Sequence, residues 1–450
     1  MSASTATGWA EKAIIPKECN VKWLTAYYDF GRKDYLIKNH DEEWIAVTEG
    51  SARRQLVRVG VVAKRNEGEL QSAVDKCLTD IQLDDCVAYA GPLAGYTQGI
   101  KTVCGQKILV TTSPKLIEPK AGDSKVLDDL IHRILGEEQS PYFLGWLKVA
   151  YESLCAEHLR PGQVLVLAGK RNSGKSLLQN IITEILGGRV AKPYRYMSGA
   201  PDFNGDLIGS EHLAIEDEIA STDIRARLAF GARIKDFTVN QVQSCHHKGR
   251  AAISLAPFWR VSVSVNDEPE NLQILPPFDE SIGDKILLFR ANKSEMPMPT
   301  QTNEQLTAFW TALVSSIPSF LFNLGQWEIP QDLECERFGI KHYHHPELLE
   351  ELSEMVPEMK LLRLTDDYLT NNPKQTQQEP FTVTADELER ELTICYGHQA
   401  QRLFTWPSAC GTYLARLENK FKHRVRNRRG ATARVWEISY PDTPRAEVTA

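Results

Sequence analysis

The chain has 450 residues, 42% of them hydrophobic and 25% charged, and a formal net charge of −7 at pH 7. This composition predicts a globular protein of about two to four domains and excludes a uniformly basic nucleic-acid coat, although it allows local basic patches. No apolar run predicts a membrane span, and residues 1–5 lack the basic and apolar regions of a signal peptide. We therefore expect a cytoplasmic protein without a membrane partner.

The nine cysteines are scattered, odd in number and nowhere spaced as C-x-x-C. This usage is typical of a reducing compartment and predicts neither a disulfide framework nor a zinc site. Cys245, His246 and His247 form the tightest cluster of potential ligands, but adjacent residues rarely bind one metal ion. We expect no metal site there.

Residues 1–125 have a mixed α+β pattern without recognisable catalytic chemistry. Strand patterns at 34–38 and 44–47 flank a polar turn and predict a hairpin. Residues 70–81 have helical periodicity, and residues 107–112 predict a further strand. We expect this region to be a collar for oligomerisation or a docking site for a partner.

Residues 169–176 fit the pattern G-x-x-x-x-G-K-[ST] of a phosphate-binding P-loop. A buried strand at 163–168 precedes the motif, and an apolar helix follows it and stops at Gly187. In this setting backbone N–H groups and the helix N-terminus bind phosphates, Lys175 reaches the β- and γ-phosphates, and Ser176 binds Mg²⁺. We therefore predict that ATP and Mg²⁺ bind here. The predicted nucleotide-binding residues are Gly169, Asn172, Ser173, Gly174, Lys175, Ser176 and Leu177.

A second strand pattern, residues 212–216, ends in carboxylates. In a P-loop enzyme one such acid holds Mg²⁺ through water and a neighbouring acid polarises the attacking water. We favour Glu216 and Asp217, with Asp217 on the Mg²⁺ side and Glu218 as the alternative if the register differs. By itself the segment would be a solvated acidic turn, and its position after a P-loop favours the catalytic interpretation.

A third strand pattern runs from Arg260 to Asn266, with valines alternating with small polar residues. A terminal Asn266 is suited to orienting the attacking water or contacting the γ-phosphate. The alternative is an asparagine that starts a turn with Asp267. The position of the strand after the acids favours the functional interpretation.

A basic segment lies between the acids and Asn266. Strand-like residues 237–239 before it and 252–255 after it predict a hairpin with a basic tip. The tip carries His246, His247, Lys248 and Arg250. Such a tip is commonly a solvated turn, but in a ring-shaped ATPase it would face the pore and grip phosphates.

The C-terminal residues predict a compact unit made of two helices and a basic hairpin. Thr384 is suited to capping a helix over 384–393, Tyr413 belongs to a second helix, and residues 427–430 predict the hairpin turn. This order predicts a winged-helix-like domain that contacts DNA. The candidate contacts are Arg424, Arg426, Arg428 and Arg429. The alternative is a protein-contact wing with solvated arginines.

The P-loop, the acidic strand and the strand ending at Asn266, in this order and at short spacing, resemble superfamily-three helicases. The likeness extends over residues 100–300 and is closer to the helicase half of poxvirus- and phage-type primase-helicases. It implies a hexameric AAA+-like ring with ATP between subunits and a positive group supplied by the neighbour. Lys285 and Arg290 are the candidates for that group: arginine suits phosphoryl charge better, whereas the register favours Lys285.

The sequence therefore predicts an α/β fold with a P-loop AAA+-like ATPase core, an α+β N-terminal region, a helical segment and a C-terminal winged-helix domain. The predicted boundaries are 1–125 for the N-terminal domain, 126–160 for a helical segment, 161–300 for the ATPase core, 301–370 for a helical extension, 371–380 for a linker and 381–441 for the winged-helix-like domain.

The resulting expectation is an ATP-dependent DNA helicase or translocase that replicates a phage, plasmid or integrated mobile element. Its expected partners are single-stranded DNA in the pore, duplex DNA at the wing, further copies of itself and a separate primase or polymerase. One alternative is a non-helicase ATPase switch for defence or assembly, which would control a protein partner. Another is a small-molecule kinase, which the basic wing and hairpin disfavour.

Overall fold

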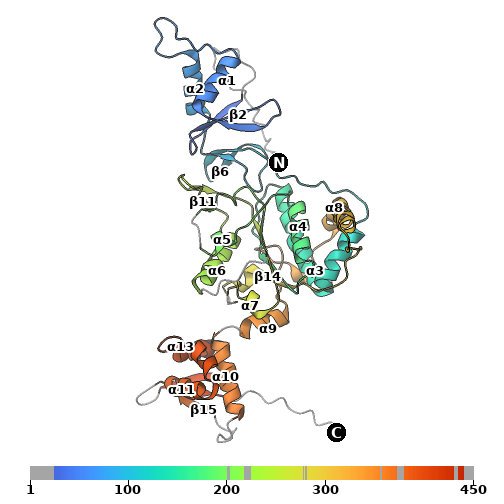
Figure 1. Ribbon diagram of the computed structural model, residues 1–450, viewed down its shortest axis with the longest axis vertical. Coiled ribbons are helices and arrows are strands. Elements are labelled where there is room, and N and C mark those ends of the chain that lie inside the picture. Colours follow the sequence, from blue (N-terminus) through green and yellow to red (C-terminus); the bar gives the residue numbers. More distant parts are fainter. Residues whose placement is uncertain are drawn as a thin grey trace, which may run out of the picture. The chain divides into compact units, whose positions relative to one another are not determined.

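The structure is a computed structural model, and it describes residues 25–199, 203–216, 224–276, 278, 281–354, 357–371, 380–429 and 434–439. The chain divides into two compact units (Figure 1). Unit 1 comprises Met1–Asp267 and Glu280–His344, and unit 2 comprises Glu268–Asp279 and His345–Ala450.

The centre of unit 1 is a five-stranded parallel sheet in the order β14-β8-β13-β10-β9. Its strands are β8 (Val164–Ala168), β9 (Val190–Ala191), β10 (His212–Glu216), β13 (Arg260–Val265) and β14 (Ile286–Arg290). β8 and β13 are buried at every position, as expected for central strands of a parallel sheet covered on both faces. The predicted α/β class is confirmed, and this sheet fits a P-loop core.

Helices lie on both sides of this sheet (Figure 1). On one side are α3 (Lys125–Cys155), α4 (Lys175–Ile185) and α8 (Asn303–Gln326), and on the other are α5 (Tyr194–Met197) and α6 (Ile224–Val239). Side chains of α3, α4 and α8 form one buried apolar cluster with residues of the sheet. The sheet contributes Leu165, Leu167, Leu287 and Phe289 to this cluster. α3 is kinked at Gly136, whose φ of 72° is left-handed.

Helix α8 is long and apolar enough to cross a membrane by length and composition, which the sequence reading did not anticipate. Its apolar residues instead belong to the core of unit 1, where Phe309, Leu313, Ile317 and Phe320 are buried with α3 and α4. A core helix passes the same test of length and hydropathy, so this helix is weak evidence for a span.

The N-terminal part of unit 1 contains two small sheets. The first has the order β3-β2-β1-β4 and the second β5-β7-β6. The strands are β1 (Ala26–Asp29), β2 (Asp34–Lys38), β3 (Trp44–Val47), β4 (Cys86–Val87), β5 (Tyr89–Gly91), β6 (Gly99–Val103) and β7 (Gln106–Val110). The predicted β2–β3 hairpin is confirmed. Helices α1 (Glu49–Arg58) and α2 (Ala73–Asp84) pack beside the first sheet, and α2 begins later than predicted because Ser72 caps it in a capping box.

The basic segment does form a hairpin, from β11 (Gln243–Cys245) and β12 (Ile253–Leu255). The prediction of a strand at residues 237–239 was wrong, because these residues complete α6. Phe230, Ile234 and Phe237 recur at helical spacing and are all buried, and Phe237 packs against Trp259 with ring centroids 4.6 Å apart.

Unit 2 contains helices and a three-stranded antiparallel sheet ordered β15-β17-β16. Its helices are α7 (Pro269–Leu272), α9 (Pro346–Glu354), α10 (Pro357–Asn371), α11 (Ala385–Tyr396), α12 (His398–Leu403) and α13 (Ala409–Lys420). Its strands are β15 (Phe381–Thr384), β16 (Val425–Arg429) and β17 (Arg434–Ile438). Thr384 caps α11 as predicted.

Two details of unit 2 differ from the sequence expectation. Strand β15 was not predicted. It pairs with β17 over all four of its residues, the last of which, Thr384, is also the N-cap of α11. The predicted turn at 427–430 was wrong, because Asn427, Arg428 and Arg429 pair with β17 as strand residues. The connection between β16 and β17 and most of the predicted linker, residues 372–379, lie outside the described residues.

Candidate nucleotide site and basic hairpin

The P-loop follows β8 and runs directly into α4, as the motif predicts. Its two glycines are sterically required. A Cβ on Gly169 would lie 2.4 Å from the carbonyl oxygen of Ala291, and Gly174 has a φ of 85° and would place a Cβ 2.7 Å from Ile134. Asn172 is also left-handed, with φ 63°. The loop therefore holds a tight curve that few residues other than glycine would permit.

Six of the seven predicted nucleotide-binding residues, all but Gly169, line one cavity of about 480 Å³. It is lined by Arg171, Asn172, Ser173, Gly174, Lys175, Ser176, Leu177 and Asn266. The Lys175 ammonium is buried and donates to the carbonyl oxygens of Gly169 at 2.7 Å and Lys170 at 3.0 Å, and to Asn266 Oδ1 at 3.3 Å. The hydroxyl of Ser173 is buried without a hydrogen-bond partner. The cavity thus presents polar groups that suit an anion.

The strand register brings the P-loop and Asn266 together. Ala168 is level with Val265 on one side and with Arg290 on the other. Gly169 follows Ala168 and Asn266 follows Val265, so both lie at the same carboxyl edge of the sheet. This edge is where open parallel sheets bind ligands.

Arg290 and Lys285 lie at opposite ends of β14. Arg290 is level with the end of β8 in its own chain, 3.7 Å from Asp267, and its backbone exchanges two hydrogen bonds with the Gln139 side chain. Lys285 precedes the strand, is buried, and donates to Asp284 at 2.6 Å. Arg290 is thus near its own P-loop, whereas Lys285 is at the far end of the sheet.

Glu216 is the last residue of β10 and pairs with Ser264 of β13. Asn266 comes two residues after Ser264, so Glu216 lies two residues short of the level of Asn266. Its carboxylate accepts a hydrogen bond from Lys192 at 2.9 Å, and it does not line the P-loop cavity. Asp217 and Glu218, the other predicted acids, lie outside the described residues.

A buried polar network beneath the P-loop helix was missed by the sequence reading. His212 on β10 hydrogen-bonds Thr183 of α4 at 2.7 Å and Ser262 of β13 at 2.7 Å. Gln179 of α4 donates to the same Ser262 hydroxyl at 2.7 Å and to the carbonyl oxygen of Ile215. Burial lowers the pKa of His212 to about 3, so the ring is neutral at pH 7. The network ties together the three elements that carry the P-loop, the acids and Asn266.

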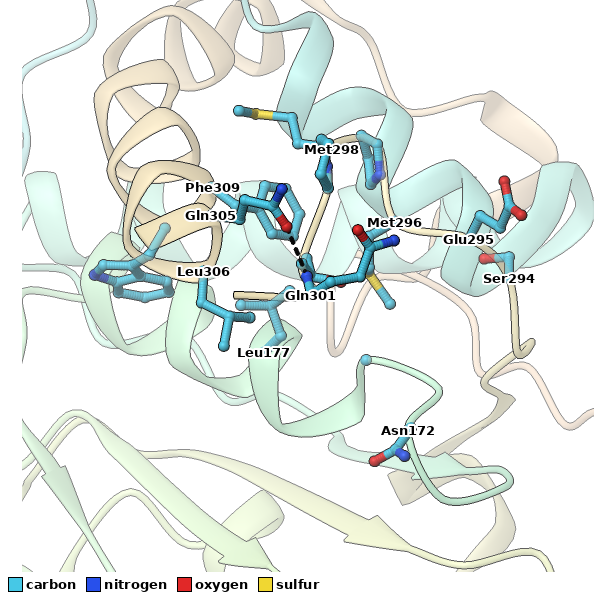
Figure 2. A pocket seen from close by; sticks show the side chains of 15 residues that line it. Asn172, Leu177, Ser294, Glu295, Met296, Met298, Gln301, Gln305, Leu306 and Phe309 are labelled. Atoms are coloured by element: carbon cyan, nitrogen blue, oxygen red, sulfur yellow. Dashed lines mark hydrogen bonds between the residues drawn. The ribbon is translucent and has the colours of Figure 1, made fainter. Parts of the chain in front are cut away.

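A second cavity, of about 860 Å³, opens beside the P-loop and shares Asn172, Gly174 and Leu177 with it (Figure 2). Its other walls are the segment 294–301 and the first turns of α8. The apolar residues of these walls include Met296, Met298, Leu306, Phe309 and Trp310. The volume is within the usual range for small-molecule pockets.

One amide on this wall is held in a fixed orientation. The side-chain oxygen of Gln305 accepts the backbone N–H of Gln301 at 2.9 Å (Figure 2). It also accepts the backbone N–H of Thr302 at 3.2 Å. These bonds belong to the capping box of α8 and leave the amide NH₂ as the remaining donor of that side chain. The alternation of methionine and proline at residues 296–299 was the sequence signal available for this wall.

The four candidate residues at the tip of the basic hairpin do not all point into solvent. Asn204 is buried, accepts the His246 N–H at 2.8 Å and donates to the Ser244 carbonyl at 3.0 Å. His247 fills the space above Gly205, where a Cβ would lie 2.4 Å from the imidazole. The two histidines therefore anchor the base of the hairpin. Lys248 is exposed and Arg250 is partly exposed.

The wing arginines are engaged within unit 2. Arg424 donates to Asp366 at 2.5 Å, Arg428 to Glu437 at 3.0 Å, and Arg426 to the carbonyl oxygen of Lys422 at 2.9 Å. The side chain of Arg429 lies outside the described residues. Arg428 nevertheless remains largely exposed.

No protein-family model and no curated protein sequence matches the chain. The fold matches solved structures of the NrS-1 C-terminal region. One apo structure in the A form aligns with a TM-score of 0.57 and 11% identity over 93% of this chain and 97% of that chain. An apo structure of residues 305–718 aligns at 0.56 with 13% identity and the same coverage, and an A-form structure of those residues aligns at 0.54 with 12% identity. The likeness is one of fold, and it extends over nearly the whole chain.

Proposed function

We propose that the chain is an ATP-dependent DNA helicase or translocase of the superfamily-three type, which serves the replication of a phage, plasmid or integrated element. The observation that carries the proposal is the cavity at the end of β8, in which the P-loop, Lys175 and Asn266 meet. The fold shared with the NrS-1 C-terminal region supports an architecture of this kind.

In this proposal the phosphates of ATP lie in the P-loop cavity. Lys175 exchanges its contacts with the carbonyl oxygens of Gly169 and Lys170 for phosphate oxygens. The buried Ser173 hydroxyl gains a partner, which removes the cost of leaving it unsatisfied. The positive N-terminal end of α4 adds to the attraction.

The residues around the phosphates also suit Mg²⁺, which prefers oxygen ligands. The Ser176 hydroxyl would bind the ion directly, and Asp217 would bind it through water. Glu216 would polarise the attacking water, and Asn266 would orient that water or contact the γ-phosphate. When bound, Mg²⁺ would neutralise charge on the phosphates.

The nucleoside end of ATP would enter the neighbouring cavity in Figure 2. The two cavities share Leu177 and Gly174, so one ligand can extend from one to the other. Met296 lies over Gly174, where a Cβ would come within 3.3 Å of its methyl group, and methionine side chains adapt to flat aromatic faces.

Movement on DNA is assigned to the hairpin tip. Lys248 and Arg250 would contact the phosphates of one strand, and His246 and His247 would hold the tip in place. The chain would act as a hexameric ring, with Lys285 or Arg290 reaching the ATP of the neighbouring subunit. A separate primase or polymerase would work with the ring at the fork.

The decisive experiment is fork unwinding by purified protein. Unwinding should require ATP, be abolished by Lys175→Ala, and be lost in a Lys248→Ala/Arg250→Ala variant that retains ATP hydrolysis. Electron micrographs with an ATP analogue and forked DNA should show a closed ring around one strand. Unwinding that survives Lys175→Ala would refute the site.

One observation favours a second candidate, an ATPase switch that controls a protein partner. Arg424 and Arg428 of the wing bond carboxylates within unit 2, which reduces their capacity to bind phosphates. DNA-independent ATP hydrolysis without strand separation would favour this switch over the helicase.

A further inference from the structure

The turn between β1 and β2 lies beside the strand that supports the basic hairpin. The Phe30 N–H donates to the carbonyl oxygen of Val87 at 3.0 Å, and a Cβ on Gly31 would lie 3.6 Å from the carbonyl oxygen of Ala88. Tyr89 follows these residues. The turn therefore runs along the segment that leads into β5.

Tyr89 in turn contacts the base of the hairpin. Its ring centroid is 5.9 Å from that of His247, and its hydroxyl is fixed on the carbonyl oxygen of Pro92 at 2.8 Å. The sheet β5-β7-β6 and the hairpin also share a buried apolar cluster, which contains Tyr89 and Val110 from the sheet and Cys245 and Leu255 from the hairpin. The β1–β2 turn and the basic hairpin therefore both pack against the segment that contains Val87, Ala88 and Tyr89.

Positive charge from both segments gathers around this contact. Besides burial, the charges of Arg250 in the hairpin and Arg32 in the turn both lower the pKa of His247. Lys33 in the turn and Lys248 in the hairpin are exposed. Acidic groups are present as well: Asp29 is buried and lies 3.6 Å from Arg32, and the charges of Asp29 and Asp206 raise the pKa of His247.

The turn also presents an aromatic ring to solvent. Phe30 is 71% exposed, and it is flanked by Gly31, Arg32 and Lys33. Asp29 holds this conformation, because its Oδ1 accepts the Arg32 N–H at 3.1 Å. An exposed aromatic ring beside basic side chains is the combination by which proteins bind single strands, since bases stack on the ring and phosphates pair with the charges.

We infer that the turn Phe30–Lys33 and the hairpin tip Lys248–Arg250 form one binding surface for single-stranded DNA, with Phe30 stacking on a base and Lys33 contacting a phosphate. The N-terminal region thereby contributes directly to the grip on the strand. This inference rests on the proposed function, because it places a second contact on the strand assigned to the hairpin.

The test measures fluorescence anisotropy of a labelled oligothymidine with the full chain and a non-hydrolysable ATP analogue. Phe30→Ala should weaken binding by about fivefold or more, the loss expected for one stacked base. Leu83→Ala is its control, since Leu83 is 75% exposed in the same region. Lys33→Glu should lower the salt dependence of binding by about 0.7 in logarithmic slope for each lost phosphate contact, and Lys64→Glu should not.

The outcomes separate this inference from the proposed function. ATP hydrolysis without DNA and melting temperature should be unchanged in all four variants. If Phe30→Ala and Lys33→Glu bind like their controls while Lys248→Ala/Arg250→Ala does not bind, the composite surface is wrong and the helicase proposal stands. If the unaltered chain binds no oligothymidine, both are wrong. Tighter binding to an oligouridine of equal length would overturn the assignment to DNA.

Discussion

The Lys175 ammonium lies 3.3 Å from the side-chain oxygen of Asn266 and so links the P-loop to the strand next to it in the sheet. The two residues are 91 positions apart in the sequence. Their contact follows from the register of β8 and β13, which places Gly169 and Asn266 at one level. In the proposed function, a nucleotide bound at Lys175 would therefore act directly on Asn266 and β13.

The first prediction concerns Lys175. Lys175→Ala should lower kcat for ATP hydrolysis by about 100-fold or more, because a preorganised positive donor at the phosphates is removed. Lys170→Ala is the control: this neighbouring side chain is exposed, and only its carbonyl oxygen contacts Lys175. A steady-state phosphate-release assay measures both, and equal rates in the two variants would contradict the site.

The second prediction separates the roles of Asn266. Asn266→Ala should lower kcat by about 100-fold with a smaller effect on the KM for ATP, because an oriented water is lost while most phosphate contacts remain. Asn240→Ala is the matched control, since Asn240 is exposed and its side-chain amide donates to Asp236 at 2.6 Å. A large rise in KM with kcat unchanged would show that Asn266 serves binding instead.

The motifs with local signatures were predictable from the sequence. The strand before the P-loop, the helix after it and the strand leading to Asn266 are all present, because buried apolar runs and glycine positions specify them locally. Gly187 and Gly188 end α4 with φ of 99° and 80°, as the helix stop predicted. The capping of α11 by Thr384 was likewise predictable from the residues at the start of this helix.

Features that depend on tertiary contacts were not predictable. Phe237 has a high propensity for strands, yet it extends α6 because its ring packs against the rings of Tyr196 and Trp259. The sequence gives no sign that His212 would meet Ser262, since they come from different strands of the sheet. The roles of Lys285, Arg290 and the wing arginines stay predictions for the same reason: they depend on surfaces beyond one chain.

The third prediction tests the register of the acids. Glu216→Gln should lower kcat by about 100-fold if Glu216 polarises water. Lys192→Ala should leave hydrolysis intact, and the loss of its ion pair with Glu216 should cost at most about 1 kcal/mol, because Lys192 is largely exposed. If Glu216→Gln hydrolyses ATP normally while Asp217→Asn does not, the general base is the next residue in the chain.

The fourth prediction concerns the cavity beside the P-loop. Leu306→Ala should raise the KM for ATP several-fold and leave kcat nearly unchanged, because Leu306 lines this cavity (Figure 2) and does not line the P-loop cavity. Phe322→Ala on the same helix is the control, since Phe322 does not line this cavity. The KM for inorganic triphosphate, which has no base, should be equal in both variants, and a rise there for Leu306→Ala would contradict a nucleoside site.

The fifth prediction is a pH dependence of stability due to His212. Burial lowers its pKa to about 3 in the folded chain, against the ordinary value of 6.5, because the ring is completely buried. Between these values the unfolded chain binds a proton that the folded chain does not, so stability falls as the pH falls through this window. From pH 7 to pH 5 the loss amounts to about 2 kcal/mol, at about 1.4 kcal/mol per unit of pH.

Comparison with His212→Gln isolates this effect from other titrating groups. The glutamine does not titrate, so the stability difference between the unaltered chain and the variant should shrink by about 2 kcal/mol between pH 7 and pH 5. Urea unfolding followed by tryptophan fluorescence measures it, with His40→Gln as the control because His40 is exposed. A difference that stays constant over this range would mean that His212 is protonated within the folded network, and the neutral ring between Thr183 and Ser262 would have to be abandoned.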